Sequence, residues 1–172
     1  AGGGDKAVVE RLAKEGASVN AKGANTRTPA VVFAARKGHT EVVKALLRLG
    51  CDPNATTPNG RTALMRAALK GNAEVVGVLL EAEAKLDAVD NEGMTALIIA
   101  AINGKAEVAA QLVEAGADAT LRDNEGKTAL KNAQDQGNTE VVALLQLEEQ
   151  KVLDGQLYDA ASGGDAAAVE RL

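Results

Sequence analysis

The stretch GRTALMRAALKGNAEVV at residues 60–76 decides the fold, because the chain repeats it at a fixed interval. GMTALIIAAINGKAEVA begins at Gly93 and GKTALKNAQDQGNTEVV begins at Gly126, each 33 residues after the previous copy. A further copy, RTPAVVFAARKGHTEVV, starts at Arg27, again 33 residues earlier. A strict period over four units predicts a solenoid, in which each unit stacks on its neighbours to bury a continuous core.

Each unit is expected to form a helix, a turn, a second helix and an extended hairpin. The first helix is predicted to open at Thr62, Thr95 or Thr128, whose hydroxyl can accept a bond from a free backbone N–H. In the earliest full unit we expect Thr28 to cap the helix and Pro29 to take the first helical position. Most of the residues after the turn glycine are expected to cap the second helix; these residues are Asp5, His39, Asn72, Lys105, Asn138 and Asp165.

The second helix is predicted from an apolar face and from the glycine that follows it. Val42, Val43, Leu46 and Leu47 share one side of a helix. Gly50 and Gly116 are expected to end it in the left-handed conformation, which glycine adopts without steric strain. Glu83 occupies the same position in another unit, so that helix either ends on a strained residue or runs on through it.

The pattern G-x-T-A-L-x-x-A-A-x-x-G-x-x-E-V-V, with LGCDPN at 49–54 and AGADAT at 115–120, resembles ankyrin repeats. The resemblance covers roughly residues 3–147 and resumes in the final segment. It implies an all-α solenoid of stacked helix pairs with projecting β-hairpin loops. The family's histidine after T-P-L is replaced here, and the residues at that position are Val32, Met65, Ile98 and Lys131.

The ends of the chain depart from the period. Residues 161–172 match residues 1–12 at nine of twelve positions. A longer helix is predicted to run to about Lys151, and the polar residues of the last full unit suggest a closing cap. The predicted division is an array at 1–152, made of a half-repeat 1–26 and repeats 27–59, 60–92, 93–125 and 126–152, followed at 153–172 by the start of a further half-repeat. Two interpretations stay open: a natural fragment of a longer super-repeat protein, which we favour, and an engineered concatenation.

Composition excludes several classes of function. The 172 residues carry a formal net charge of −5, which argues against nucleic-acid binding. No apolar run approaches the ~18 residues of a membrane span, and the N-terminus lacks a signal-peptide pattern. The single cysteine, Cys51, excludes an internal disulfide framework. We therefore expect an intracellular protein, cytoplasmic or nuclear, with no membrane association.

Candidate chemical sites are better explained by the repeat. Residues 126–128, Gly-Lys-Thr, resemble the end of a phosphate-binding loop, but Leu121 stands where that loop needs its first glycine. The turn DNEG at 90–93 lacks the alternating acidic ligands of a calcium loop. Soft metal ligands are limited to Cys51 and His39. We expect no enzyme activity, no cofactor and no metal site.

With these chemical sites set aside, the remaining candidate for function is a binding surface. In ankyrin repeats, partners lie in a concave groove made by the hairpin tips and the exposed ends of the first helices. By position, the partner-binding residues implied here are Arg36, Lys37, Arg61, Leu69, Lys70, Asn91, Glu92, Met94, Ile102, Asn103, Asn124, Glu125, Lys127 and Asp135. Along the stack their charge changes from basic to acidic, with apolar side chains in the middle. We predict a module that binds a protein or peptide ligand; the alternatives are a structural or engineered scaffold without a ligand, and the non-catalytic targeting arm of a larger enzyme.

A second contact is predicted at the ends. The N-terminal half-unit is expected to present Val8, Val9 and Leu12 without a first-helix partner. The segment 157–161 has the sequence of such a partner. Exposed apolar surface of this kind favours association, so we predict head-to-tail contact between molecules.

Overall fold

The protein is an all-α solenoid, as predicted. A computed structural model describes residues 3–24 and 27–162. Within them the chain forms α1 (Gly3–Lys14), α2 (Ala30–Lys37), α3 (Thr40–Arg48), α4 (Ala63–Lys70), α5 (Ala73–Glu81), α6 (Ala96–Ile102), α7 (Ala106–Glu114), α8 (Ala129–Gln136) and α9 (Thr139–Ser162). The only β pairing in these residues is an isolated bridge between Lys22 and Pro29. None of their helices is both long and apolar enough to cross a membrane.

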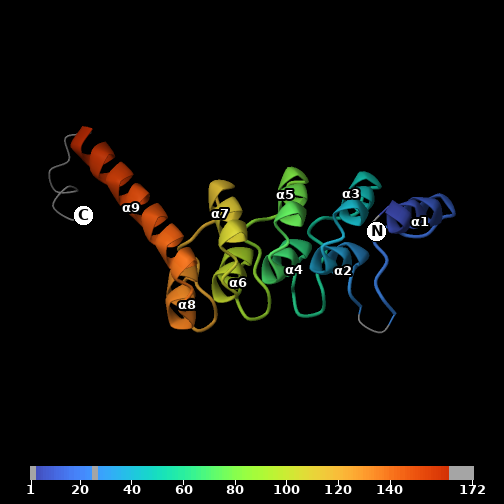
Figure 1. The fold of residues 1–172 in the computed structure, drawn as a ribbon, viewed down its shortest axis with the longest axis horizontal. Coiled ribbons are helices and arrows are strands. Elements are labelled where there is room, and N and C mark those ends of the chain that lie inside the picture. The colour runs from blue at the N-terminus through green and yellow to red at the C-terminus, as the bar shows by residue number, and fades with distance from the viewer. Residues whose placement is uncertain (1–2, 25–26, 163–172) are drawn as a thin grey trace.

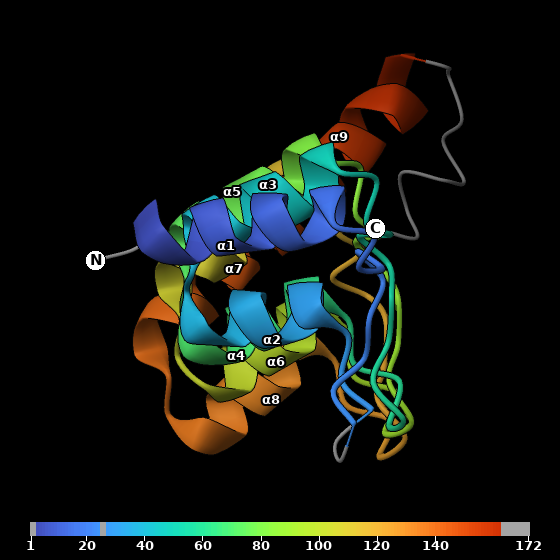
Figure 2. The same cartoon turned by 90° about the vertical axis from the view of Figure 1, so that its right-hand side faces the viewer.

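The helices form two parallel rows (Figure 1). The first helices α2, α4, α6 and α8 pack in sequence against one another, and the second helices α1, α3, α5, α7 and α9 do the same. The loops gather along one side of both rows (Figure 2). Hairpin tips and first helices therefore lie next to each other along the length of the stack.

Small side chains make the close stacking possible. Ala67 and Ala68 in α4, like Ala100 and Ala101 in α6, are fully buried between neighbouring first helices. Leucine, isoleucine and valine, together with Met65 and Cys51, fill the rest of the core. A core with this composition has little need of aromatic residues, which explains why they make up 1% of the chain.

The predicted threonine caps are confirmed. Thr62, Thr95 and Thr128 each accept a hydrogen bond from the backbone N–H three residues later, at 3.2, 3.2 and 3.3 Å. The prediction for Pro29 is wrong, because Pro29 is the N-cap itself, with ψ 145°, and the helix begins at Ala30. Pro29 occupies the position of the three threonines, so the period is kept, but this N-cap residue makes no side-chain cap hydrogen bond.

Three of the residues expected to cap the second helices occupy the N-cap position as predicted, but their side chains do not cap. His39, Asn72 and Lys105 make no side-chain cap hydrogen bond. The amide of Asn72 donates instead to Ala35 O of the previous unit at 2.8 Å. The reason is that the last carbonyls of a helix lack donors within that helix, and the neighbouring unit brings these carbonyls within reach.

Asn138 repeats this arrangement two periods further on, donating to Ala101 O at 2.7 Å and Ile102 O at 3.0 Å. We call Asn72 and Asn138 the asparagine latches. Each lies over the turn glycine of the previous unit: a Cβ on Gly104 would come within 2.8 Å of Asn138 Oδ1. The latch thus needs glycine there for space as well as for its φ of 61°.

The two remaining predicted caps have different outcomes. Asp5 lies inside the first turn of α1, because that helix already begins at Gly3. Asp165 lies outside the described residues.

Glu83 ends its helix where glycine does elsewhere. Its φ is 55°, against 84° at Gly50 and 91° at Gly116. Glu83 N donates to Leu80 O at 3.0 Å, as Gly116 N does to Val113 O at 2.9 Å. The helix therefore does not run on; the unit keeps the standard left-handed end despite carrying a Cβ.

The last helix is longer than predicted. α9 continues past Lys151 to Ser162, and its outer end extends beyond the stack (Figure 1). Glutamate, glutamine, lysine and leucine favour helix along this stretch, and one glycine at 155 does not interrupt it. No helix break marks the predicted boundary between 152 and 153, and residues 163–172 lie outside the described residues.

Candidate protein-interaction surface

The hairpins are built on buried carboxylates. Asp90 Oδ1 accepts the backbone N–H groups of Glu92 and Met94 at 2.9 and 3.0 Å. Asp123 repeats this, with 2.9 Å to the N–H groups of both Glu125 and Lys127. The acidic turn residues therefore shape the hairpins. Among the described residues, no group of three or more histidine, cysteine or acidic side chains is placed to hold a metal ion.

Asp123 also accepts from the buried side chain of Asn132, whose Nδ2 lies 2.8 Å from Oδ2. Burial by itself raises the pKa of Asp123, but the hydrogen bonds from Asn132 and from the backbone of Lys127 and Glu125 outweigh it and hold the pKa below its ordinary value. This carboxylate is thus ionised and fully engaged in the fold.

Neighbouring hairpin tips are tied together. Asn91 N donates to Asn59 O, and Asn124 N donates to Glu92 O, both at 3.1 Å. The side chain of Asn124 adds a bond to Asn91 O at 3.0 Å. The tips therefore keep fixed relative positions, which makes the surface beside them preformed.

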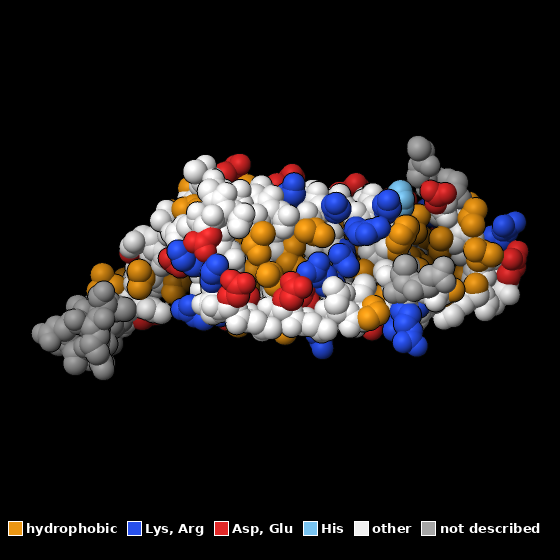
Figure 3. Space-filling view, turned by 90° about the horizontal axis from the view of Figure 1, so that it is seen from below, with side chains coloured by type: hydrophobic (Ala, Val, Ile, Leu, Met, Phe, Trp, Pro, Cys, Tyr) orange, Lys and Arg blue, Asp and Glu red, His pale blue; other side chains and the backbone are white. Residues whose placement is uncertain are grey.

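We call these tips and the outer side of the first-helix row the interaction face, the candidate surface for a partner. Seen from that side, basic side chains gather toward the N-terminal half and acidic ones toward the C-terminal half, with hydrophobic side chains between (Figure 3). The predicted change in charge along the stack is therefore present on one surface.

At the acidic end most charges are paired. Lys127 Nζ lies 3.2 Å from Glu125 and 3.1 Å from Asp135, and Lys131 lies 2.8 Å from Asp135. The neighbouring Lys131 and Lys127 lower the pKa of Asp135, while Asp135 and Glu125 raise the pKa of Lys127. These residues already neutralise one another and leave little net charge for a partner.

Arg61, another predicted binding residue, holds adjacent hairpins together. Its Nε lies 2.8 Å from Asp90, whose side chain is 1% exposed, and its Nη2 lies 3.2 Å from Glu92. The guanidinium of Arg61 is therefore already engaged in contacts within the fold.

The basic end is different. Four cations on this face, Arg36, Lys37, Arg66 and Lys70, form no ion pair with any described residue, and we call them the basic cluster. Arg66 is half-buried. Its pKa is lowered by burial and by the nearby charges of Arg61 and Arg36, whereas the carboxylate of Asp90 raises it. Positive charge is thus concentrated here, and none of it is neutralised by an ion pair within the described residues.

Phe33 lies beside the basic cluster and was missed by the sequence analysis. Its side chain is 49% exposed. The guanidinium of Arg36 lies 5.6 Å, and the ammonium of Lys37 5.9 Å, from the ring centroid, within cation–π range. The available signal was its uniqueness: it is the single phenylalanine, at a position where later units have Arg66, Ile99 and Asn132.

The apolar centre is only partly available. Leu69, Met94 and Ile102 are half-buried and pack against the core. Asn103 turns its amide back to Ile99 O at 2.8 Å, closing the end of its own helix. Only part of each apolar side chain is therefore open to a partner.

The two residues with potential side-chain chemistry stand apart from this face. Cys51 is 4% exposed, and burial together with Asp52 raises the pKa of its thiol. His39 is exposed at the start of α3. Among the described residues, neither side chain forms a hydrogen bond or ion pair with a nucleophilic or acid–base side chain.

Stacked helix pairs with a ridge of tied hairpins define a helical-repeat solenoid. A family model described as ankyrin repeats (three copies) matches residues 1–90 and 84–155. The chain belongs to the ankyrin repeat family, whose members generally act as protein–protein interaction modules and are typically non-catalytic.

Proposed function

We propose that the chain binds an extended peptide or protein loop on the interaction face, with the acidic part of the ligand over the basic cluster. The observation that carries this proposal is the contrast in charge pairing. The cations at the acidic end have carboxylate partners, whereas Arg36, Lys37, Arg66 and Lys70 have none among the described residues. A carboxylate-rich ligand would supply the missing counter-charge.

The central side chains Leu69, Met94 and Ile102 favour a ligand that is apolar in its middle. A few apolar anchors surrounded by charge are typical of interfaces whose energy is concentrated in few residues. Because the hairpin tips are already tied to one another, binding costs little ordering of the protein.

The test is a selection from a library of random twelve-residue peptides, followed by binding kinetics. We expect enrichment of peptides with acidic residues beside an apolar segment. Arg36→Glu/Lys37→Glu should slow association at least tenfold and weaken its dependence on salt, because long-range attraction is removed. Met94→Ala and Ile102→Ala should mainly speed dissociation.

The matched control is Lys14→Glu/Lys85→Glu, which makes the same change in net charge at exposed lysines away from this face. It should leave the kinetics close to those of the unchanged chain. The proposal is wrong if the selected peptides survive all substitutions on the face and are lost with Glu107→Lys/Glu114→Lys on the second-helix row. Failure to enrich any peptide would favour the scaffold without a ligand.

A further inference from the structure

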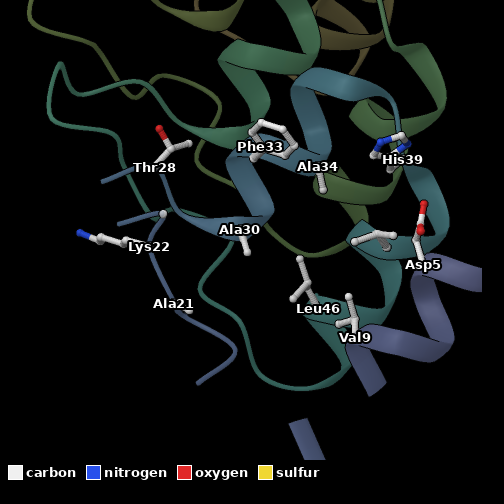
Figure 4. Close-up of a pocket in the computed structure, with 12 residues that line it drawn as sticks. Asp5, Val9, Ala21, Lys22, Thr28, Ala30, Phe33, Ala34, His39 and Leu46 are labelled. Carbon is white, nitrogen blue, oxygen red and sulfur yellow. The ribbon is translucent and has the colours of Figure 1, made fainter. Parts of the chain in front are cut away.

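A hollow of about 610 Å³ lies at the N-terminal end of the stack, between α1, α2 and α3 (Figure 4). Its apolar wall comes from all three helices and consists of Val9, Ala30, Phe33, Ala34, Val42 and Leu46. We call it the N-terminal seat.

The later units show what such a seat holds. The positions of Ala30, Phe33 and Ala34 recur in α4, with Arg66 in place of Phe33, and in α6, with Ile99 there; in both helices the preceding first helix covers this side. Ile99, at the position of Phe33, is 5% exposed because α4 packs against it; Phe33 is 49% exposed. Among the described residues, no helix lies before α2 as α2 lies before α4. The seat has the shape of a position for a first helix.

The chain contains the sequence of such a helix at its other end. Residues 157–162 read LYDAAS, which aligns with LMRAAL at 64–69 and LIIAAI at 97–102. The residues that follow, GGDAAAVERL, nearly repeat GGDKAVVERL at 3–12, which includes most of α1. Segment 157–162 therefore directly precedes a close copy of α1 in sequence, as a first helix precedes its second helix.

This segment is unused in the stack. Leu157 and Tyr158 are 45% and 75% exposed, whereas Leu64 and Met65 at the equivalent positions are each 1% exposed. The segment forms the outer end of α9, at the opposite end of the row from α1 (Figure 1). The rigid array between them prevents the segment from reaching the seat of its own molecule.

We propose that segment 157–162 of one molecule occupies the N-terminal seat of a second copy. Leu157 then takes the buried position that Leu64 holds in α4, and the ring of Phe33 is covered as Ile99 is. Such a contact joins different surfaces and does not close, so it produces linear chains of molecules.

Two variants of the full chain test this by sedimentation velocity across a concentration series. The seat variant is Phe33→Asp, and the segment variant is Leu157→Asp/Tyr158→Asp; all three positions are largely exposed, so the fold should persist, which circular dichroism checks. The unchanged chain should show a sedimentation coefficient that rises with concentration. Each variant should associate at least tenfold more weakly.

Mixing the variants gives the sharper result. The seat variant still has an intact segment and the segment variant an intact seat, so together they should form a 1:1 complex and nothing larger. Val89→Asp, at an apolar residue 55% exposed in another loop, is the control and should associate like the unchanged chain. A chain ending at residue 152 should behave like the segment variant.

Three results would overturn the proposal: an unchanged chain that stays monomeric throughout, association that survives both variants, or a mixture that gives no 1:1 complex. None of these bears on peptide binding at the basic cluster, so the two proposals fail separately.

Discussion

Replacing Glu83 by glycine is expected to stabilise the protein. Glu83 holds φ at 55°, in the left-handed region that costs a residue with a Cβ about 1–2 kcal/mol. Glycine removes that strain but adds conformational freedom to the unfolded chain, which offsets about 0.5–1 kcal/mol. The side chain of Glu83 is exposed and makes no hydrogen bond or ion pair in the described structure. The net gain is therefore about 0.5–1 kcal/mol.

Urea unfolding followed by circular dichroism measures this gain. With a slope of about 2 kcal/mol/M, the midpoint should rise by about 0.3–0.5 M. Glu83→Ala separates the contributions: it removes the carboxylate but keeps the Cβ, so it should give no comparable rise.

Gly116→Ala is the mirror control. Gly116 ends α7 with φ 91°, and a Cβ there would meet no atom within 4 Å. Any loss of stability therefore reports backbone strain rather than crowding, and the midpoint should fall by a similar amount. If Glu83→Gly lowers the midpoint or leaves it unchanged, the assignment of strain to this helix end is refuted.

Three further predictions follow from contacts in the core of the array. Asn138→Ala should lower the free energy of unfolding by about 1 kcal/mol, measured in urea, because two carbonyl groups at the end of α6 lose their side-chain donor. Asp123→Asn should lower the free energy of unfolding at pH 7. The pKa of Asp123 in the folded chain lies below its ordinary value of 3.8, so the ionised carboxylate stabilises the fold above that pH, and this stabilisation is lost as the pH falls through the folded pKa. In acid-unfolding curves, the difference in stability between the two proteins should therefore close below pH 3.8. Cys51 should react with a thiol reagent at neutral pH more slowly in the folded chain than in urea, because burial raises its pKa; equal rates would contradict the buried position.

The sequence predicted those features that depend on a residue and its immediate neighbours. The Thr62 cap is set within three residues, and the left-handed helix ends follow from glycine at a fixed place. The stacking followed from the period of 33 because only neighbouring units can bury the apolar faces of both helices.

Contacts between units were beyond this reasoning. An asparagine at a helix start suggests a cap by general preference, yet the structure shows Asn72 bonded to a carbonyl 37 residues earlier in the sequence. Arg61 was assigned to a partner surface because it is basic and near a hairpin tip, while its neighbour in space, Asp90, lies 29 residues away. Such pairings depend on how one unit is aligned against the next, and the sequence pattern within one unit does not specify that alignment.

For the same reason the exposure of Phe33 could not be predicted from the sequence. An apolar residue on a first helix is normally covered by the preceding unit, and its exposure depends on what lies in front of α2. The basic cluster likewise depended on knowing which cations find carboxylates. The change of charge along this face could be predicted from the sequence, whereas the cations that lack a carboxylate partner among the described residues emerged only from the geometry.

The asparagine latches connect neighbouring units through a contact that is the same at either joint where it occurs. Each latch joins the start of one unit's second helix to the end of the previous unit's first helix, and that end has the same left-handed glycine at 38, 71, 104 and 137. Excising residues 93–125 would bring Asn138 over Gly71, where Ala68 and Leu69 present the same carbonyls as Ala101 and Ile102. The array can therefore lengthen or shorten by whole periods without redesigning any joint, whereas removal of a partial period would leave a latch facing the wrong residue.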